Sequence, residues 1–144
     1  MQKIMSEFGP TGQVAWVYRH FPLQIHSQAQ VEAVATECVA ELAGEEAFWS
    51  YHDKIFEVTP SNNGLDLTQL PKLATELGIT LDDFNSCLSS NRHADRVEND
   101  LQNAIESGGT GTPFNLIIDR AGKPHYLGGA IPFEELRGLI NSLL

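Results

Sequence analysis

The side chains in this sequence that are best suited to covalent chemistry are two cysteines, Cys38 and Cys87. Catalytic dithiols and paired zinc ligands both use a short Cys-x-x-Cys spacing, and these two residues are too far apart to form it. Cys38 lies in the middle of a predicted helix, away from the helix N-terminus that activates a thiol, so it is a weak candidate for a nucleophile. The spacing alone leaves two interpretations open for the pair: buried apolar side chains, or a disulfide between distant helices.

The other polar residues indicate no second reaction site. The five histidines are scattered without a His-x-x-x-His pair, and a structural zinc site needs about four nitrogen or sulfur ligands, so we predict no metal site. His52 precedes Asp53, as a base and its orienting carboxylate could, but adjacent helix positions face different directions, which disfavours a hydrolase. The glycine-rich run 108–113 follows a predicted helix and opens a strand. Because a phosphate-binding loop has the reverse order, we predict no cofactor.

Composition narrows the function further. The formal net charge is −10, which disfavours nucleic-acid binding because phosphates are bound by clustered Lys and Arg. The sequence has no run of about 18 apolar residues that could span a membrane. Residues 1–9 are too short and too polar for a signal peptide. The length of 144 residues suits a single domain with one core.

Hydrophobic periodicity predicts the order helix, strand, group of helices, hairpin, helix. The strand is predicted over Val14–Phe21, and a β-hairpin is predicted from Phe114–Asp119 through Arg120–Gly122 to Lys123–Leu127. The predicted helices are Met1–Phe8, one from about Ser27 to Gly44, a second through Phe48 and Phe56, Leu67–Leu77, Leu81–Leu88 with Thr80 as N-cap, Ala94–Ile105, and a terminal helix that buries Phe133, Leu136, Leu139, Ile140 and Leu143.

Thr112-Pro113 stands at the start of the predicted hairpin. Proline donates no hydrogen bond to a sheet ladder, so the first position of a strand is one of the places where it is tolerated. The residues alone therefore explain Pro113 as a strand-entry proline, and they do not predict a cis peptide bond there.

Taken in order along nearly the whole chain, the segments of this sequence resemble the DsbA-like thiol–disulfide oxidoreductases, a branch of the thioredoxin fold. The most specific part is Thr112-Pro113 before a strand, followed by the hairpin and the terminal helix. The other matching segments are Tyr18–Leu23, Glu37-Cys38, Ala47–Trp49 with His52–Phe56, Phe84-x-x-Cys87-Leu88, Gly109–Phe114 and Gly128–Pro132.

The resemblance implies a thioredoxin-like α/β fold, with residues 1–144 as one domain that carries a helical insertion over about 27–107. It also implies thiol–disulfide exchange on protein or peptide thiols and disulfides outside the cytoplasm, in the periplasm or in secreted proteins. In the family a cis-proline loop faces the catalytic dithiol and holds the substrate backbone. Thr112 and Pro113 are therefore the predicted substrate-binding residues. Family members often carry cysteines at the positions of Cys38 and Cys87, so the resemblance favours a structural disulfide between them.

The sequence departs from the family pattern at its start. Family members place a Cys-x-x-Cys at the beginning of the first helix, after the first core strand, and Met1–Phe8 matches only the end of that helix. We therefore expect an N-terminally truncated member that has no catalytic residues and is redox-inactive as this chain alone. Two alternatives stay open: a non-catalytic peptide-binding or structural module that keeps the proline groove, and a glutathione-binding isomerase or transferase of the same fold.

The family pattern also implies a consequence for the sheet. The first core strand lies between the strands that match Val14–Phe21 and Phe114–Asp119, so both would expose unpaired backbone groups, which is a template for pairing with another chain. We expect self-association, in which a second chain fills or covers the gap. Direct closure is less favoured because packed helices would have to shift by about one strand spacing, roughly 4.8 Å.

Overall fold

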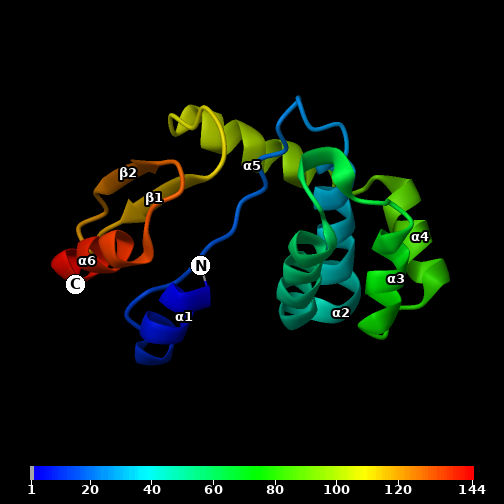
Figure 1. Ribbon diagram of the computed structural model, residues 1–144, viewed down its shortest axis with the longest axis horizontal. Helices are drawn as coiled ribbons and strands as arrows, with labels where there is room; N and C mark the ends of the chain where they lie inside the picture. The colour runs from blue at the N-terminus through cyan, green and yellow to red at the C-terminus, as the bar shows by residue number, and fades with distance from the viewer. Residues whose placement is uncertain (1) are drawn as a thin grey trace. The chain divides into compact units, whose positions relative to one another are not determined.

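The computed structural model describes residues 2–144, which divide into two compact units. The helical unit comprises residues 20–103, and the hairpin unit comprises residues 1–19 together with 104–144. In chain order, the helices and strands labelled in Figure 1 are α1 (Gln2–Phe8), α2 (Ala29–Val58), α3 (Gln69–Glu76), α4 (Leu81–Ser90), α5 (Ala94–Glu106), β1 (Phe114–Ile118), β2 (Pro124–Gly128) and α6 (Phe133–Leu143). This division leaves the single-domain assignment a prediction.

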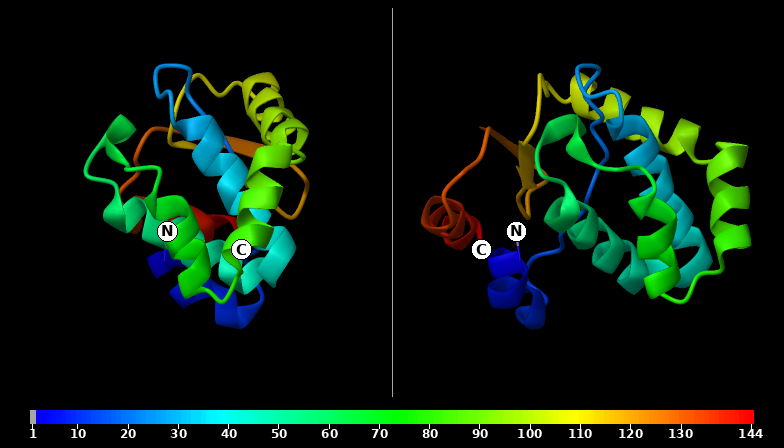
Figure 2. Two further views of the ribbon diagram at one scale, coloured as in Figure 1. Left: turned by 90° about the vertical axis from the view of Figure 1, so that its right-hand side faces the viewer. Right: turned by 45° about the vertical axis from the view of Figure 1, so that its right-hand side comes forward.

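In the helical unit, α2 consists of two helical halves joined at a bend. Gly44 interrupts the helix with φ 84° and ψ −177°, a conformation open to glycine because it has no Cβ. Figure 2 shows α2, α3 and α4 lying side by side, and each of the three contacts the other two. Apolar side chains of these helices, with Leu65 and Ile79 of the connecting loops and Val97 of α5, form one buried cluster: Ala33, Val34, Ala35, Cys38, Val39, Tyr51, Ile55, Leu65, Leu70, Leu73, Ala74, Ile79, Phe84, Cys87 and Val97.

The start of α4 confirms the predicted cap. Thr80 has an extended backbone, and its hydroxyl oxygen accepts a hydrogen bond of 3.2 Å from the backbone N–H of Asp83. The same hydroxyl donates to the Asp83 carboxylate at 2.6 Å. The cap satisfies a backbone donor that has no partner within the helix, and it fixes the residue at which α4 begins.

In the hairpin unit, β1 and β2 pair antiparallel, with Leu116 opposite Tyr126. The connecting turn is organised by Asp119, whose Oδ1 accepts hydrogen bonds of 2.9 Å from the backbone N–H groups of Ala121 and Lys123. Its Oδ2 lies 2.9 Å from His125 Nε2. The hydrogen bond with His125, followed by those from the backbone, holds the pKa of Asp119 below its usual range.

The core of the hairpin unit is small. Ile4 and Phe8 of α1 and Ile140 of α6 are its buried members, and an ion pair of 2.6 Å between Arg137 Nε and Glu7 Oε1 also joins these two helices. The other predicted core residues of α6 are half-buried: Phe133, Leu136, Leu139 and Leu143. The prediction that α6 buries five side chains was therefore wrong for four of them, because the sheet of the described residues has two strands and covers little of the helix.

The predicted strand over Val14–Phe21 is also corrected by the structure. Exposure alternates residue by residue from Val14 to Arg19, as in an extended chain, but the segment belongs to no sheet. A strand needs a neighbour that completes its ladder of hydrogen bonds. The sheet of residues 2–144 contains β1 and β2 alone. The composition of Val14–Phe21 therefore predicted its extended conformation correctly, but among these residues the segment pairs with no strand.

Candidate functional site

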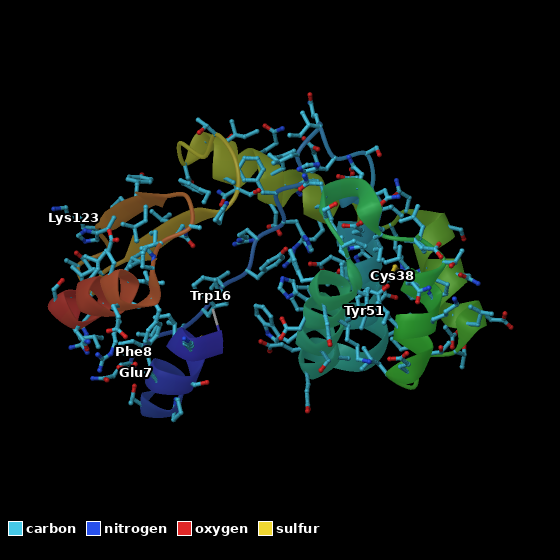
Figure 3. All side chains as sticks on the ribbon, in the orientation of Figure 1. Glu7, Phe8, Trp16, Cys38, Tyr51 and Lys123 are labelled. Carbon is cyan, nitrogen blue, oxygen red and sulfur yellow. A yellow bond between two sulfur atoms is a disulfide. The ribbon has the colours of Figure 1, made fainter. Side chains whose placement is uncertain are left out.

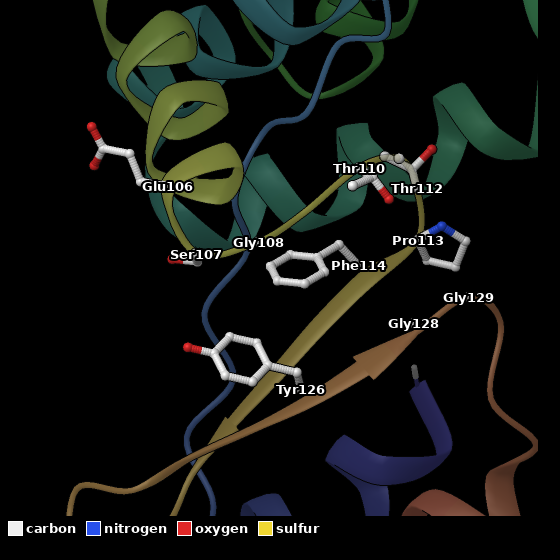
Figure 4. A pocket seen from close by; sticks show the side chains of 11 residues that line it. Glu106, Ser107, Gly108, Thr110, Thr112, Pro113, Phe114, Tyr126, Gly128 and Gly129 are labelled. Atoms are coloured by element: carbon white, nitrogen blue, oxygen red, sulfur yellow. The ribbon is translucent and has the colours of Figure 1, made fainter.

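An open groove of about 710 Å³ lies along the beginning of β1, within the hairpin unit. The groove contains both predicted substrate-binding residues, Thr112 and Pro113, which are exposed and joined by a cis peptide bond. Figure 4 shows the side chains that line it: Glu106, Ser107, Thr110, Thr112, Pro113, Phe114 and Tyr126, with Gly108, Gly111, Gly128 and Gly129 contributing backbone.

The C-terminal end of α5 directs the chain toward this groove. Gly109 N–H donates to Ala104 O at 2.8 Å and Gly108 N–H donates to Ile105 O at 2.9 Å. Gly108 has φ 90°, which completes a Schellman motif that ends the helix and satisfies two of its last carbonyls. The residues from Gly109 onward are therefore turned away from the helix axis and can form the strand entry.

The far side of the groove is tied to the strand entry by hydrogen bonds. Pro113 O accepts from Gly129 N–H at 3.1 Å, and the Asn115 amide donates to Gly129 O at 3.2 Å. A Cβ added at Gly128 or Gly129 would meet no heavy atom within 4 Å. The glycines thus leave space above the backbone at the place where β2 faces Pro113.

Two aromatic rings form one wall of the groove. Phe114 and Tyr126 stack with ring centroids 6.5 Å apart and an interplanar angle of 27°, and Figure 4 shows both rings on the same side of the hairpin. Tyr126 is 58% exposed. Glu106 is the one charged residue in the lining. Such a surface suits a neutral or apolar extended chain, which can contact aromatic rings and exposed backbone together.

The two cysteines lie in the helical unit. Cys38 of α2 and Cys87 of α4 form a disulfide with a Cα–Cα distance of 5.8 Å, and neither is exposed (Figure 3). The disulfide that the resemblance favoured is therefore present. The chain has no free cysteine, so the pair acts in this structure as a cross-link inside the core.

A polar cluster borders the disulfide at the surface. Glu41, one helical turn after Cys38, accepts from Arg92 Nη2 and Nε at 2.5 and 2.8 Å, and it lies 2.7 Å from His93 Nε2. Arg92, and after it His93, lowers the pKa of the Glu41 carboxyl to about 2. Glu41 therefore stays ionised through the whole physiological range.

A buried polar cluster in the helical unit was not predicted from the sequence. His20 Nε2 lies 2.9 Å from Glu37 Oε1, and its backbone N–H donates to Asp100 Oδ2 at 3.2 Å, with all three residues at most 9% exposed. The hydrogen bond from His20 is the main cause that lowers the pKa of Glu37. The partners are up to 80 residues apart, so no spacing in the sequence could have brought them together.

The structure also corrects the prediction for His52 and Asp53. The two were expected to face different directions, but His52 Nδ1 lies 3.0 Å from Asp53 Oδ1. Rotation about the side-chain torsions brings the two polar tips together at the helix surface even though their Cα–Cβ bonds diverge. The half-buried His52 also contacts the rings of Phe48, Trp49 and Phe56, which makes it part of an aromatic row on α2.

A family model described as "DSBA-like thioredoxin domain" matches residues 1–141. The chain belongs to this family. The crystal structure of Pseudomonas aeruginosa DsbA2 superposes with a TM-score of 0.77 at 27% sequence identity, covering 99% of this chain and 79% of that one. The fold is thus the thioredoxin-like DsbA fold predicted from the sequence, an α/β arrangement that is mainly helical here with a two-stranded sheet.

Curated relatives contain a similar segment within longer proteins. The Na(+)/H(+) antiporter NhaA 3 of Salinispora tropica is 36% identical over 74% of this chain and 16% of its own length. The Na(+)/H(+) antiporter NhaA 1 of Salinispora arenicola is 33% identical over 90% of this chain and 18% of its own. The chain therefore spans less than a fifth of these relatives. Among residues 2–144, no helix is long and apolar enough to cross a membrane.

Phe114 and Tyr126 are the groove residues that sequence reasoning missed. A signal for Tyr126 existed in the hairpin itself. Once the turn around Arg120–Gly122 is fixed, antiparallel pairing places residues of Lys123–Leu127 opposite those of Phe114–Asp119, and alternation puts Phe114, Leu116 and Tyr126 on one face. The predicted substrate-binding site contained only Thr112 and Pro113, the two residues that the family resemblance implied.

Proposed function

We propose that residues 1–144 form one DsbA-like thiol–disulfide oxidoreductase domain that binds unfolded segments of extracytoplasmic proteins, with Thr112 and Pro113 as the substrate-binding residues. The observation that carries this proposal is the groove at the start of β1, where exposed backbone and two aromatic rings meet. Family membership indicates protein thiols and disulfides as the substrate class.

The chemistry of the groove suits an extended peptide. Thr112 offers an exposed hydroxyl and backbone beside Pro113, and Phe114 with Tyr126 offers a flat apolar face for one side chain of the ligand. Because Glu106 is the one charged residue in the lining, the groove should discriminate little between ligands of different charge. Binding would then depend on an accessible backbone and one apolar side chain, which unfolded segments display and folded proteins bury.

We propose further that this chain by itself does not exchange disulfides. Both of its cysteines are in the buried cross-link between α2 and α4, and a dithiol exchanger needs an accessible thiolate. The same observation supports a second candidate function, a non-catalytic peptide-binding module that uses the same groove.

The Cys38–Cys87 disulfide supports an extracytoplasmic location. Buried structural disulfides persist in oxidising environments such as the bacterial periplasm and are rare in the cytosol, so the proposed site of action is extracytoplasmic.

Self-association also remains a proposal. In the described residues β1 pairs with β2 on one side and with no strand on the other, and Leu116 and Ile118 are exposed along it. An open, apolar strand edge can pair with a second copy. Light scattering at micromolar concentrations tests this: a dimer supports it, and a monomer over the whole concentration range contradicts it.

An NMR titration tests the binding proposal. The probe is a short unstructured peptide with one apolar residue beside an S-methylated cysteine, which cannot react. We expect amide shifts confined to Thr110–Phe114 and Tyr126–Gly129, and an affinity about 10-fold weaker for Tyr126→Ala, equivalent to about 1.4 kcal/mol. Pro124→Ala, at the other end of β2 and exposed, serves as the matched control. Shifts elsewhere, or none at millimolar peptide, would reject the groove as the site.

A further inference from the structure

A potential metal site lies at the disulfide of the helical unit. One ligand atom each from Cys38, Cys87 and His93 lies within 4.8 Å of the other two. We propose that, once the Cys38–Cys87 bond is reduced, the two thiolates and the His93 ring bind one zinc ion, so that this position alternates between a disulfide and a zinc site.

The spacing of the three ligand atoms is compatible with tetrahedral zinc. Zinc binds thiolate sulfur at about 2.3 Å and imidazole nitrogen at about 2.0–2.1 Å, so two ligand atoms of one ion lie roughly 3.5–3.8 Å apart. The present separations stay within 4.8 Å. The sulfur atoms would move apart when their bond is broken, which is toward the spacing that zinc requires. Cys38 of α2 and Cys87 of α4 come from helices already packed together, and His93 precedes α5 directly.

The charge of a zinc site is compatible with this buried position. Both cysteines are fully buried within an apolar cluster, where an uncompensated charge is costly. A zinc ion with two thiolates and a neutral imidazole has no net charge, like the disulfide that it replaces. With two free thiols, α2 and α4 would be joined neither by the disulfide nor by a zinc ion.

The surface cluster around Glu41 would orient the histidine ligand. His93 Nε2 lies 2.7 Å from Glu41 Oε2, and Arg92 holds that carboxylate by two hydrogen bonds. Histidine ligands of zinc commonly donate their second ring N–H to a carboxylate, which fixes the ring and the tautomer. This arrangement leaves His93 Nδ1 for the ion and a fourth coordination position for water.

The switch needs a two-electron reductant, which we specify as a small dithiol in large excess, because both cysteines are buried away from the dithiols of protein substrates. The reductant's two thiols become one disulfide, and Cys38–Cys87 becomes two thiols that take up the two protons. Zinc then displaces both protons as the thiolates bind it. Return to the disulfide requires a two-electron oxidant, which we specify as a second disulfide. The two thiolates form the Cys38–Cys87 bond, the oxidant is reduced to two thiols that take up two protons, and the ion is released.

The His20, Glu37 and Asp100 cluster is the weaker metal candidate. Its ligand atoms also lie within 4.8 Å of one another, but two of its three ligands are carboxylates, which are hard oxygen ligands. The Cys38 site offers two soft sulfur ligands, which select zinc more strongly.

Cobalt titration of the reduced chain tests the proposal. Co²⁺ takes the place of Zn²⁺, and its bonds to thiolate give a charge-transfer absorption in the near ultraviolet. After reduction by a dithiol and removal of the excess, we expect one Co²⁺ per chain, displaced by Zn²⁺, and a rise in the melting temperature with metal. The oxidised chain should show no such band.

Variants separate this site from general metal binding. Cys87→Ala should abolish the band, and Glu41→Gln should weaken binding by about 10–100-fold, as for other second-sphere carboxylates. His93→Ala and Glu41→Gln keep both cysteines, so their oxidised folds can be verified by circular dichroism before reduction. His26→Ala is the matched control. The proposal is overturned if the reduced chain gives no band, if His93→Ala binds as tightly as the unmodified chain, or if urea-unfolded chain binds equally well.

Discussion

The helical unit and the hairpin unit of this molecule bury very different amounts of apolar surface. In the helical unit, 15 buried residues form one cluster that a disulfide crosses. In the hairpin unit, the buried cluster of described residues has 3 members, Ile4, Phe8 and Ile140, with half-buried side chains around them. The groove at Pro113 belongs to the second unit.

This difference separates stability from recognition. Burial at about 25 cal/mol per Å² of apolar surface makes the helical unit the main source of folding free energy. The groove is built from turns, glycines and a strand entry, whose exposed side chains contribute little to folding and are free to contact a ligand. Substitutions in the two units should therefore act on different measurements.

Removing the disulfide should have the largest effect on stability. The bond closes a loop with a sequence separation of 49, and loop-closure entropy predicts a loss of about 4 kcal/mol in the free energy of unfolding. Urea unfolding of the Cys38→Ala, Cys87→Ala double variant, followed by circular dichroism, measures it, with Ser89→Ala on α4 as control. A loss below about 1 kcal/mol would show that the cross-link does not stabilise the helical unit.

Tyr51→Phe should lower the free energy of unfolding by about 0.5–1.5 kcal/mol. The Tyr51 hydroxyl donates to Leu70 O at 3.0 Å inside the core, and both residues are at most 1% exposed. The variant keeps the ring but removes this buried hydrogen bond, and a typical hydrogen bond contributes that much to stability. The same urea experiment checks it. An unchanged midpoint would mean that water reaches the carbonyl.

The contribution of Glu41 to folding stability should depend on pH. The pKa of Glu41 falls from its ordinary 4.5 to about 2 in the folded chain, chiefly through Arg92. A lowered carboxyl pKa stabilises the fold fully above about pH 4.5, and this contribution is lost as the pH falls toward 2. The midpoint difference between Glu41→Gln and the unmodified chain should therefore shrink from pH 7 to pH 3. Glu57→Gln, an exposed carboxylate near the end of the same helix, is the control, and a constant difference would refute the prediction.

Tyr126→Ala should leave the free energy of unfolding within about 0.5 kcal/mol, as for most exposed side chains. The ring is 58% exposed and packs mainly on Phe114. Together with the expected loss of peptide affinity, this result would show that Tyr126 contributes to peptide binding and little to folding stability. A loss above about 2 kcal/mol would instead make the stacked pair part of the hairpin core and weaken the comparison between the units.

Local features of the fold were predictable from the sequence. The cap of α4 follows from Thr80 and Asp83 three residues apart, and the break at Gly44 follows from a glycine within an apolar helical period. The hairpin follows from its turn residues and alternation. Each of these depends on residues close together in the chain.

Features that depend on distant partners were not predictable in the same way. The segment Val14–Phe21 has strand composition, but pairing is non-local and the sheet does not include it. The contacts of His20 with Glu37 and Asp100 join separate helices. The spacing of Cys38 and Cys87 left their pairing open, and the family resemblance favoured the disulfide that the structure shows.

A disulfide-exchange assay on the 144-residue chain tests the central claim most directly, namely that recognition lies in the groove and that the cysteines serve as a cross-link. The assay follows insulin reduction in the presence of dithiol, and oxidation of a reduced dithiol peptide in its absence. We predict background rates in both directions, with Cys38–Cys87 still oxidised after the second reaction. Exchange above background that disappears in Cys38→Ala would contradict the account, because it would make the buried pair the reactive centre.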